Sequence, residues 1–166
     1  MRNMACAALV LIALPCCAHA AEPDPVLAGP VNYEVRSWGR IILRWEVKPD
    51  GSGEIWRGRP GKGAGEVRKF RLRLPDDALR TFARNLEDVR EVTKGGVTCD
   101  KEIYDLPYGT ITWDYPGGKQ GYAFDAGCRS EEADEVMDIL GAANSVLENM
   151  AAIDAKPYVT EHVEPR

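Results

Sequence analysis

Alternation of apolar and polar residues is the feature that most constrains how this chain can fold. In the first half, apolar side chains occupy every second position in two runs, Ile41, Leu43, Trp45, Val47 and Phe70, Leu72, Leu74. This period of two is the pattern of a half-buried strand, because successive side chains of a strand point to opposite faces. In residues 76–86 the apolar positions recur every three or four residues, which predicts a helix with one buried stripe.

The second half repeats this order. Residues 101–106, 109–115 and 119–125 have the strand pattern, and the Pro-Gly-Gly sequence at 116–118 predicts a turn. A helical pattern then runs from Ser130, a preferred N-cap residue, to about residue 152. The order strands, helix, strands, helix predicts an α+β fold: an antiparallel sheet of five to seven strands with two helices packed on one face.

Two turn signals divide the first half into separate strands. The Pro-Asp-Gly-Ser-Gly sequence at 49–53 predicts a tight turn between strands 41–48 and 53–59, because proline presets one turn angle and glycine allows positive φ. The Ser37-Trp38-Gly39 sequence interrupts the alternation, so we expect either a break between two strands there or a β-bulge.

The N-terminus has the pattern of a secretory signal peptide. Arg2 supplies a positive charge, residues 5–17 are apolar, and Ala18-His19-Ala20 matches the small-x-small pattern of a cleavage site. We therefore expect residues 1–20 to be removed and the protein to be periplasmic or secreted. Residues 21–30 are expected to be an extended segment, 31–153 a single α+β domain, and 154–166 a flexible C-terminal tail.

Two alternative interpretations of the N-terminus fit less well. A transmembrane anchor needs about twenty apolar residues, and the apolar stretch here is shorter. A lipid-attachment cysteine is expected after a small residue, whereas Cys16 follows Pro15 and Cys17 follows Cys16.

The cysteines that remain after residue 20 are Cys99 and Cys128. Two cysteines in an oxidising compartment are usually bonded to each other, so we expect a structural disulfide between them. Their separation is unlike the Cys-x-x-Cys spacing of redox sites.

Few residues remain for catalysis. After residue 20, His162 is the only histidine, and it lies in the predicted tail, so a Ser-His-Asp or Cys-His site has no base within the domain. The cysteine and histidine spacing does not suit zinc, and we find no glycine-rich nucleotide motif, so we expect no metal and no cofactor. Paired carboxylates are the remaining option: Asp114 and Asp125 would face each other across the turn at 116–118 and act as acid and base in a hydrolase.

Charge is distributed unevenly along this acidic chain of net charge −5, whose sign argues against general nucleic-acid binding. Residues 36–94 contain fifteen basic and nine acidic residues, whereas 95–166 contain five basic and fourteen acidic ones. In the basic half, one sheet face is expected to carry a row of cations, Arg40, Arg44, Arg57, Lys69, Arg71 and Arg73. The row either binds an acidic protein or an anionic envelope component, or is a solvated face or one covered by the acidic second helix.

The aromatic residues suggest a further type of site, a platform for carbohydrate or peptide. Among the four tryptophans we expect Trp56 to be the most exposed, because its neighbours Ile55 and Arg57 take the opposite face of the strand. The alternative is that the tryptophans fill the core of a small two-layer domain.

Three features describe the chain as a whole: the leader, the glycine-rich hairpin, and a cysteine pair on either side of the sequence LPYGTITW at 106–113. In these features the chain resembles small extracytoplasmic bacterial proteins that carry no assigned function. The resemblance covers the chain after residue 20 loosely and implies no active residues. We expect a non-enzymatic binding or accessory module, with inhibition as one form of that role. A carboxylate-based hydrolase and a structural envelope protein are the alternatives.

Overall fold

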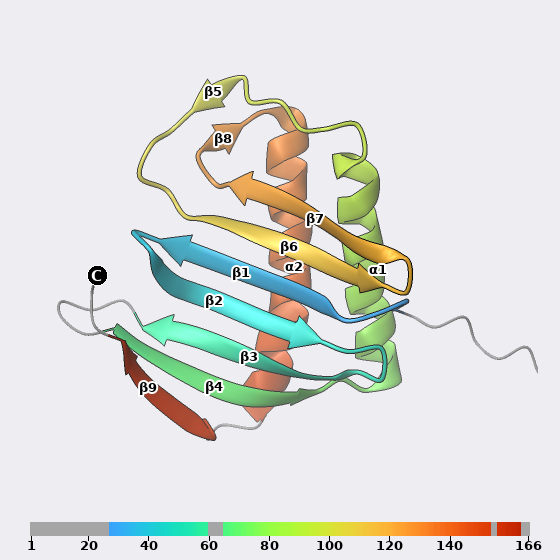
Figure 1. Ribbon diagram of the computed structural model, residues 1–166, viewed down its shortest axis with the longest axis vertical. Helices are drawn as coiled ribbons and strands as arrows, with labels where there is room; N and C mark the ends of the chain where they lie inside the picture. Colours follow the sequence, from blue (N-terminus) through green and yellow to red (C-terminus); the bar gives the residue numbers. More distant parts are fainter. Residues whose placement is uncertain (1–26, 60–64, 154–155, 164–166) are drawn as a thin grey trace, which may run out of the picture.

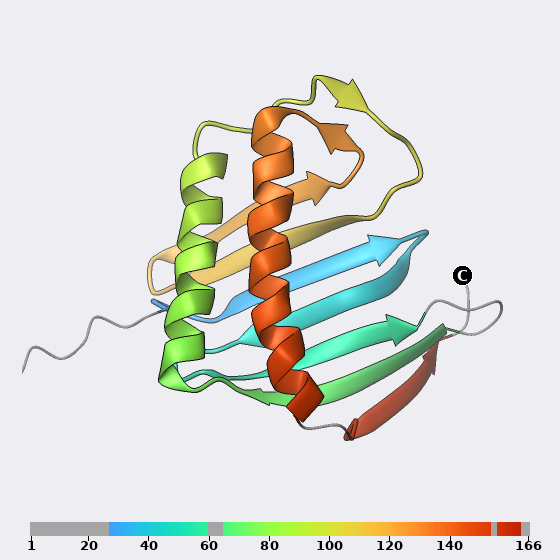
Figure 2. The same ribbon diagram turned by 180° about the vertical axis from the view of Figure 1, so that it is seen from behind.

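The computed structural model describes residues 27–59, 65–153 and 156–163, so the predicted signal peptide lies outside the described residues. A seven-stranded antiparallel sheet carries two helices on one face, and its other face is uncovered by helices (Figures 1 and 2). The predicted α+β class and the order strands, helix, strands, helix are confirmed.

The sheet follows the order β7-β6-β1-β2-β3-β4-β9, and β5 and β8 form a separate two-stranded ribbon. The first half of the chain contains β1 (Val31–Ser37), β2 (Arg40–Val47), β3 (Ser52–Arg59), β4 (Gly65–Arg73) and α1 (Asp76–Thr93). The second half contains β5 (Lys101–Glu102), β6 (Tyr108–Tyr115), β7 (Gly118–Asp125), β8 (Cys128–Arg129), α2 (Glu131–Ile153) and β9 (Val159–Val163).

The turn between β2 and β3 forms as its sequence predicts. The Asp50 carboxylate accepts hydrogen bonds from the Ser52 backbone N–H, at 3.0 Å, and from the Ser52 hydroxyl. Gly51 has a φ of +75°, and a Cβ at this position would lie 2.8 Å from the Leu74 carbonyl oxygen. Glycine is therefore required here by both its backbone conformation and the available space.

The second helix begins where its sequence predicts. The Ser130 hydroxyl accepts a hydrogen bond from the Ala133 backbone N–H at 3.1 Å, which satisfies one of the free donors of the first turn. The first turn of α2 is acidic, and α1 begins with Asp76 and Asp77 directly after Pro75. These carboxylates favour the positive end of each helix dipole.

The core is centred on Trp45, which is fully buried between the sheet and both helices. Its indole stacks on Tyr33 at a ring distance of 5.0 Å and meets the edge of Phe82 in α1 at 5.2 Å. The indole N–H donates to the Asn144 side-chain oxygen in α2 at 2.8 Å, and the Asn144 amide donates to the Tyr33 hydroxyl at 3.2 Å. Burial raises the pKa of Tyr33, so this hydroxyl stays neutral.

Two segments differ from the sequence-based expectation. The strand predicted over residues 101–106 ends at Glu102, and a loop continues to β6. Asp105 and Pro107 explain the early end, because aspartate is frequent in turns and proline has no N–H for a ladder. The C-terminal segment was expected to be a flexible tail, but Val159–Val163 forms β9 and pairs with β4.

Asn144 tests the link between α2 and the sheet. Replacement of Asn144 by Ala removes the partner of the buried Trp45 indole N–H, so we expect the free energy of unfolding to fall by about 1–3 kcal/mol. Urea denaturation followed by tryptophan fluorescence measures this change. The neighbouring exposed residue Ser145 provides a control, because Ser145→Ala should change stability by less than about 0.5 kcal/mol. Equal effects of the two substitutions would contradict a special role for Asn144.

Candidate functional site

Exposed apolar side chains are concentrated at one end of the sheet. In the described part of the chain there are seven large ones, and six of them come from the β1–β2 hairpin and the β5–β6 connection: Trp38, Ile42, Ile103, Tyr104, Leu106 and Tyr108. We call these six residues the aromatic end. Arg36 pairs with Tyr108 across β1 and β6, so both segments leave the sheet at the same end, as Figures 1 and 2 show.

The turn that carries Trp38 has an unusual residue for its conformation. Trp38 has a φ of 51° and Gly39 a φ of 74°, so both central residues of the turn are in the left-handed region, which favours Asn-Gly. A bulky residue in this region costs about 1–2 kcal/mol. The Trp38 side chain is 76% exposed, so an indole lies largely in solvent at the tip of this hairpin.

Arg36 holds this turn in place. Its Nη1 donates to the Gly39 carbonyl oxygen at 3.0 Å, and its Nε donates to the Glu34 carboxylate. The hydrogen bond with Glu34 raises the pKa of the Arg36 guanidinium, which therefore stays charged. One side chain thus fixes the turn to the strand that precedes it.

The loop between β5 and β6 is fixed at both ends to one short segment. The Ile103 N–H donates to the Gly127 carbonyl oxygen, and the Ala126 N–H donates to the Pro107 carbonyl oxygen, both at 2.8 Å. Between these bonds, Asp105 has a φ of 64°. Trp38 and Asp105 are the only non-glycine residues with positive φ in the described part of the chain. Both lie in the segments that form the aromatic end, and strained backbone of this kind clusters at functional sites.

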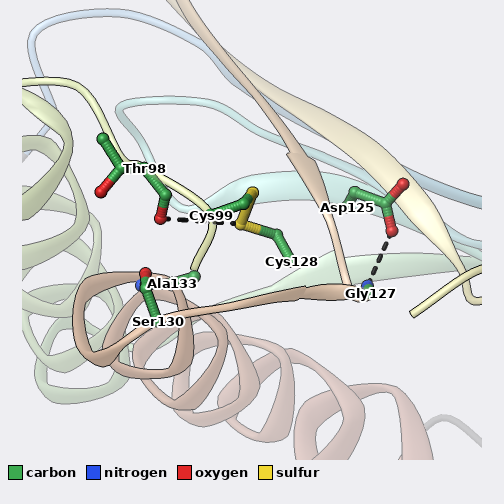
Figure 3. The surroundings of a disulfide bond; sticks show 7 residues. All are labelled: Thr98, Cys99, Asp125, Gly127, Cys128, Ser130 and Ala133. Carbon is green, nitrogen blue, oxygen red and sulfur yellow. Dashed lines mark hydrogen bonds between the residues drawn. A yellow bond between two sulfur atoms is a disulfide. The ribbon is translucent and has the colours of Figure 1, made fainter. Parts of the chain in front are cut away.

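The Cys99–Cys128 disulfide, drawn in Figure 3, lies beside the paired strands β5 and β8, and β5 leads directly into this loop. The two Cα atoms are 5.1 Å apart, and the predicted disulfide is confirmed. Beside it, the Asp125 carboxylate accepts a hydrogen bond from the Gly127 N–H at 2.7 Å. The disulfide joins the segment after α1 to the segment before α2, so the loop is anchored to both helices through covalent bonds.

A groove of about 670 Å³ adjoins the aromatic end. Its lining includes Glu34, Arg36, Tyr108, Thr110 and Asp125, together with the disulfide. Tyr108 lines the groove and is also part of the aromatic end, and Arg36 lines the groove beside it. The groove and the aromatic end are therefore continuous. The combined surface presents apolar rings beside fixed charged groups, which is the composition of a recognition surface.

Three members of the predicted cation row lie within ion-pair distance of acidic neighbours. On the uncovered sheet face, Arg44 lies 3.9 Å from Glu34, Lys69 lies 2.6 Å from Glu161, and Arg73 lies 3.6 Å from Asp50. The guanidinium of Arg71, on the same face, lies 5.2 Å from the centre of the Tyr158 ring. The acidic helix α2 covers the opposite face, so it does not cover these cations.

One member of the predicted row, Arg57, lies on the other face of the sheet, which corrects the expectation for this residue. Arg57 shares the face of Ile55 and Leu43, and its Nη2 donates to the Glu148 carbonyl oxygen of α2 at 3.1 Å. The period of two puts it there, in phase with Ile55 rather than with Trp56. Arg40 pairs with Ser37 beyond a register shift at Val35/Arg36, so the alternation that relates it to Arg44 is broken.

The carboxylates proposed for a hydrolase do not converge. Asp114 pairs with Lys119 near the β6–β7 turn and forms an ion pair with it at 3.1 Å. Asp125 pairs with Tyr108 at the other end of the same hairpin. Only Asp125 lines the groove. The expected facing arrangement across the turn is wrong, because the register places Lys119 opposite Asp114.

Trp56 is also less exposed than expected. It is half-buried on the uncovered face, and the Arg44 guanidinium lies 3.9 Å from its ring centre. The exposed tryptophan is Trp38. Gly39 between two alternating runs is the signal of a hairpin tip, and the residue before the glycine in such a turn is exposed.

Substitution of Trp38 tests whether its backbone is strained. Trp38→Asn replaces a bulky residue by one that tolerates the left-handed region, so we expect stability to increase by about 1 kcal/mol and Tm to rise by about 2–4 °C. Differential scanning calorimetry measures both values. As a control in the same turn, Gly39→Ala should lower Tm, because alanine is strained at positive φ. A lower Tm for Trp38→Asn would mean that the indole stabilises the fold.

The chain was compared with known proteins. No protein-family description matches the sequence, and no match was found among curated proteins or among solved structures. Within the described residues, no helix has both the length and the apolar character needed to cross a bilayer.

Proposed function

We propose that this protein is an exported, non-enzymatic binding module that contacts another protein through its aromatic end. The observation that carries the proposal is that two features occur in the same segments. The most exposed large apolar side chains, Trp38 and Tyr104, lie in the same two segments as the strained residues Trp38 and Asp105.

Exposure of this kind supports a contact surface. Trp38 is 76% exposed and Tyr104 is 80% exposed, and burying such rings against a partner removes a large apolar area from water. Tryptophan and tyrosine are also enriched among the residues that dominate binding energy at protein interfaces. A structural envelope role alone gives no reason for a strained turn that exposes an indole.

Rigid anchoring supports the same proposal. The turn is held by Arg36, and the β5–β6 loop is held by two backbone hydrogen bonds and the nearby disulfide. A loop that is already ordered loses less conformational entropy on binding than a flexible one. The disulfide and the N-terminal leader pattern together support export to the periplasm or to the medium.

Capture by variant proteins tests this proposal. The exported protein is immobilised and exposed to envelope and culture-medium proteins of its producing cells. We expect captured protein to be lost with Trp38→Asn and with Tyr104→Ser, because both remove exposed rings from the aromatic end. Circular dichroism of each variant confirms that the fold is retained.

The matched control is Tyr158→Ser, since Tyr158 is 41% exposed but lies beside β9 at the far edge of the sheet. This variant should capture as well as the unchanged protein. Equal capture by all three variants would contradict binding through the aromatic end. Loss with Arg71→Glu alone would instead assign binding to the cation row.

A further inference from the structure

The β5–β6 loop is convex. Figures 1 and 2 show the segment between β5 and β6 arching outward from the sheet. Its first end hydrogen-bonds to Gly127 and its last end to the adjacent residue, Ala126. At its outer part, Ile103, Tyr104 and Leu106 are 43%, 80% and 38% exposed. A rigid convex loop with apolar side chains is complementary to a concave apolar surface on a partner.

Acidic side chains outnumber basic ones along this loop, and Arg129, which lies opposite Lys101 in β8, is paired with Asp134. Asp100, Glu102 and Asp105 are exposed, and their carboxylates form no ion pair within the described residues. The only base between residues 100 and 106 is Lys101, which leaves this segment with a net charge of −2. The whole chain has the same sign, with a net charge of −5. An acidic loop on an acidic protein attracts a basic partner at long range.

The same charges disfavour two other occupants of this surface. An anionic membrane surface would repel the three carboxylates, although tyrosine and tryptophan suit its interface. A second copy of the chain would bring two acidic loops together, and like charges at an interface are unfavourable.

We infer that the partner is a basic protein with an apolar cleft, and that the loop from Ile103 to Tyr108 enters this cleft. Tyr104 and Leu106 fill the cleft, and Glu102 and Asp105 meet basic residues at its rim. Trp38 contacts the partner beside the cleft. This inference rests on the proposed function and assigns the chemistry of the partner.

Photo-crosslinking from inside the loop tests the inference. Tyr104 is replaced by benzoylphenylalanine in the exported protein, which keeps an aromatic side chain at this position. The probes are two fractions of the envelope and culture-medium proteins, one that binds a cation exchanger at pH 7 and one that flows through it. We expect crosslinked protein from the bound, basic fraction, and at least about tenfold less from the flow-through. The same photoreactive residue at position 158 should give no crosslink.

A second experiment removes the negative charges of the loop. In the crosslinkable protein, Glu102→Gln with Asp105→Asn should lower the crosslinking rate about tenfold at low salt, and much less at high salt. The control variant, Asp88→Asn with Glu148→Gln, removes the same charge from the helix side of the molecule and should have little effect.

The outcomes separate this inference from the proposed function. Crosslinks that come mainly from the flow-through fraction, or that are insensitive to Glu102 and Asp105, overturn the basic partner and leave the contact surface in place. A crosslinked product that survives complete protease digestion as a glycan overturns both. No crosslink from position 104, together with unchanged capture by the Trp38 and Tyr104 variants, also overturns both.

Discussion

The packing of both helices on the sheet depends on one buried tryptophan, which contacts the sheet and each of the two helices. Trp45 stacks on Tyr33 within the sheet, meets Phe82 from α1, and donates its N–H to Asn144 from α2. A two-layer domain has a single core, so the side chain at its centre fixes how both helices lie on the sheet. Both helices are used on this face, which leaves the opposite face and the strand ends accessible.

Polar side chains have different kinds of partner in the core and on the uncovered face of the sheet. In the core, each polar group of the Trp45, Asn144 and Tyr33 network has a partner, which avoids the cost of burying an unpaired group. On the uncovered face, several cations pair with carboxylates, as Lys69 does with Glu161, whereas Glu46 lies opposite Glu54. The aromatic end follows neither rule. It exposes apolar rings beside hydrated carboxylates, and exposed apolar patches are typical of surfaces that contact another molecule.

The fold was largely predictable because the period of two and the helical period are strong signals. Leu43, Trp45 and Val47 are buried as their alternation predicts, and Ser130 caps α2. The disulfide was predictable from the two remaining cysteines. The helical and strand patterns indicate which residues share the buried face. Arg57 is two residues after Ile55, so the same alternation places it on the face of Ile55 and not in the cation row.

The candidate site was less predictable, because it consists of turns rather than periodic elements. Residues 101–106 contain Ile103 and Leu106 and were interpreted as a strand, whereas turn chemistry at Asp105 and Pro107 ends the strand at Glu102. Register was the second obstacle. Asp114 meets Lys119 rather than Asp125, and no sequence pattern fixes such pairing.

The position of the disulfide has a consequence for the integrity of the exposed loop. Cys99 precedes the loop and Cys128 follows it, at a sequence separation of 29. If a protease hydrolyses one peptide bond within the loop, the two resulting fragments remain joined by the sulfur–sulfur bond. The new ends are also held by the backbone hydrogen bonds to Ala126 and Gly127. A nicked molecule therefore keeps its fragments together, and resealing of the cut bond remains an intramolecular reaction.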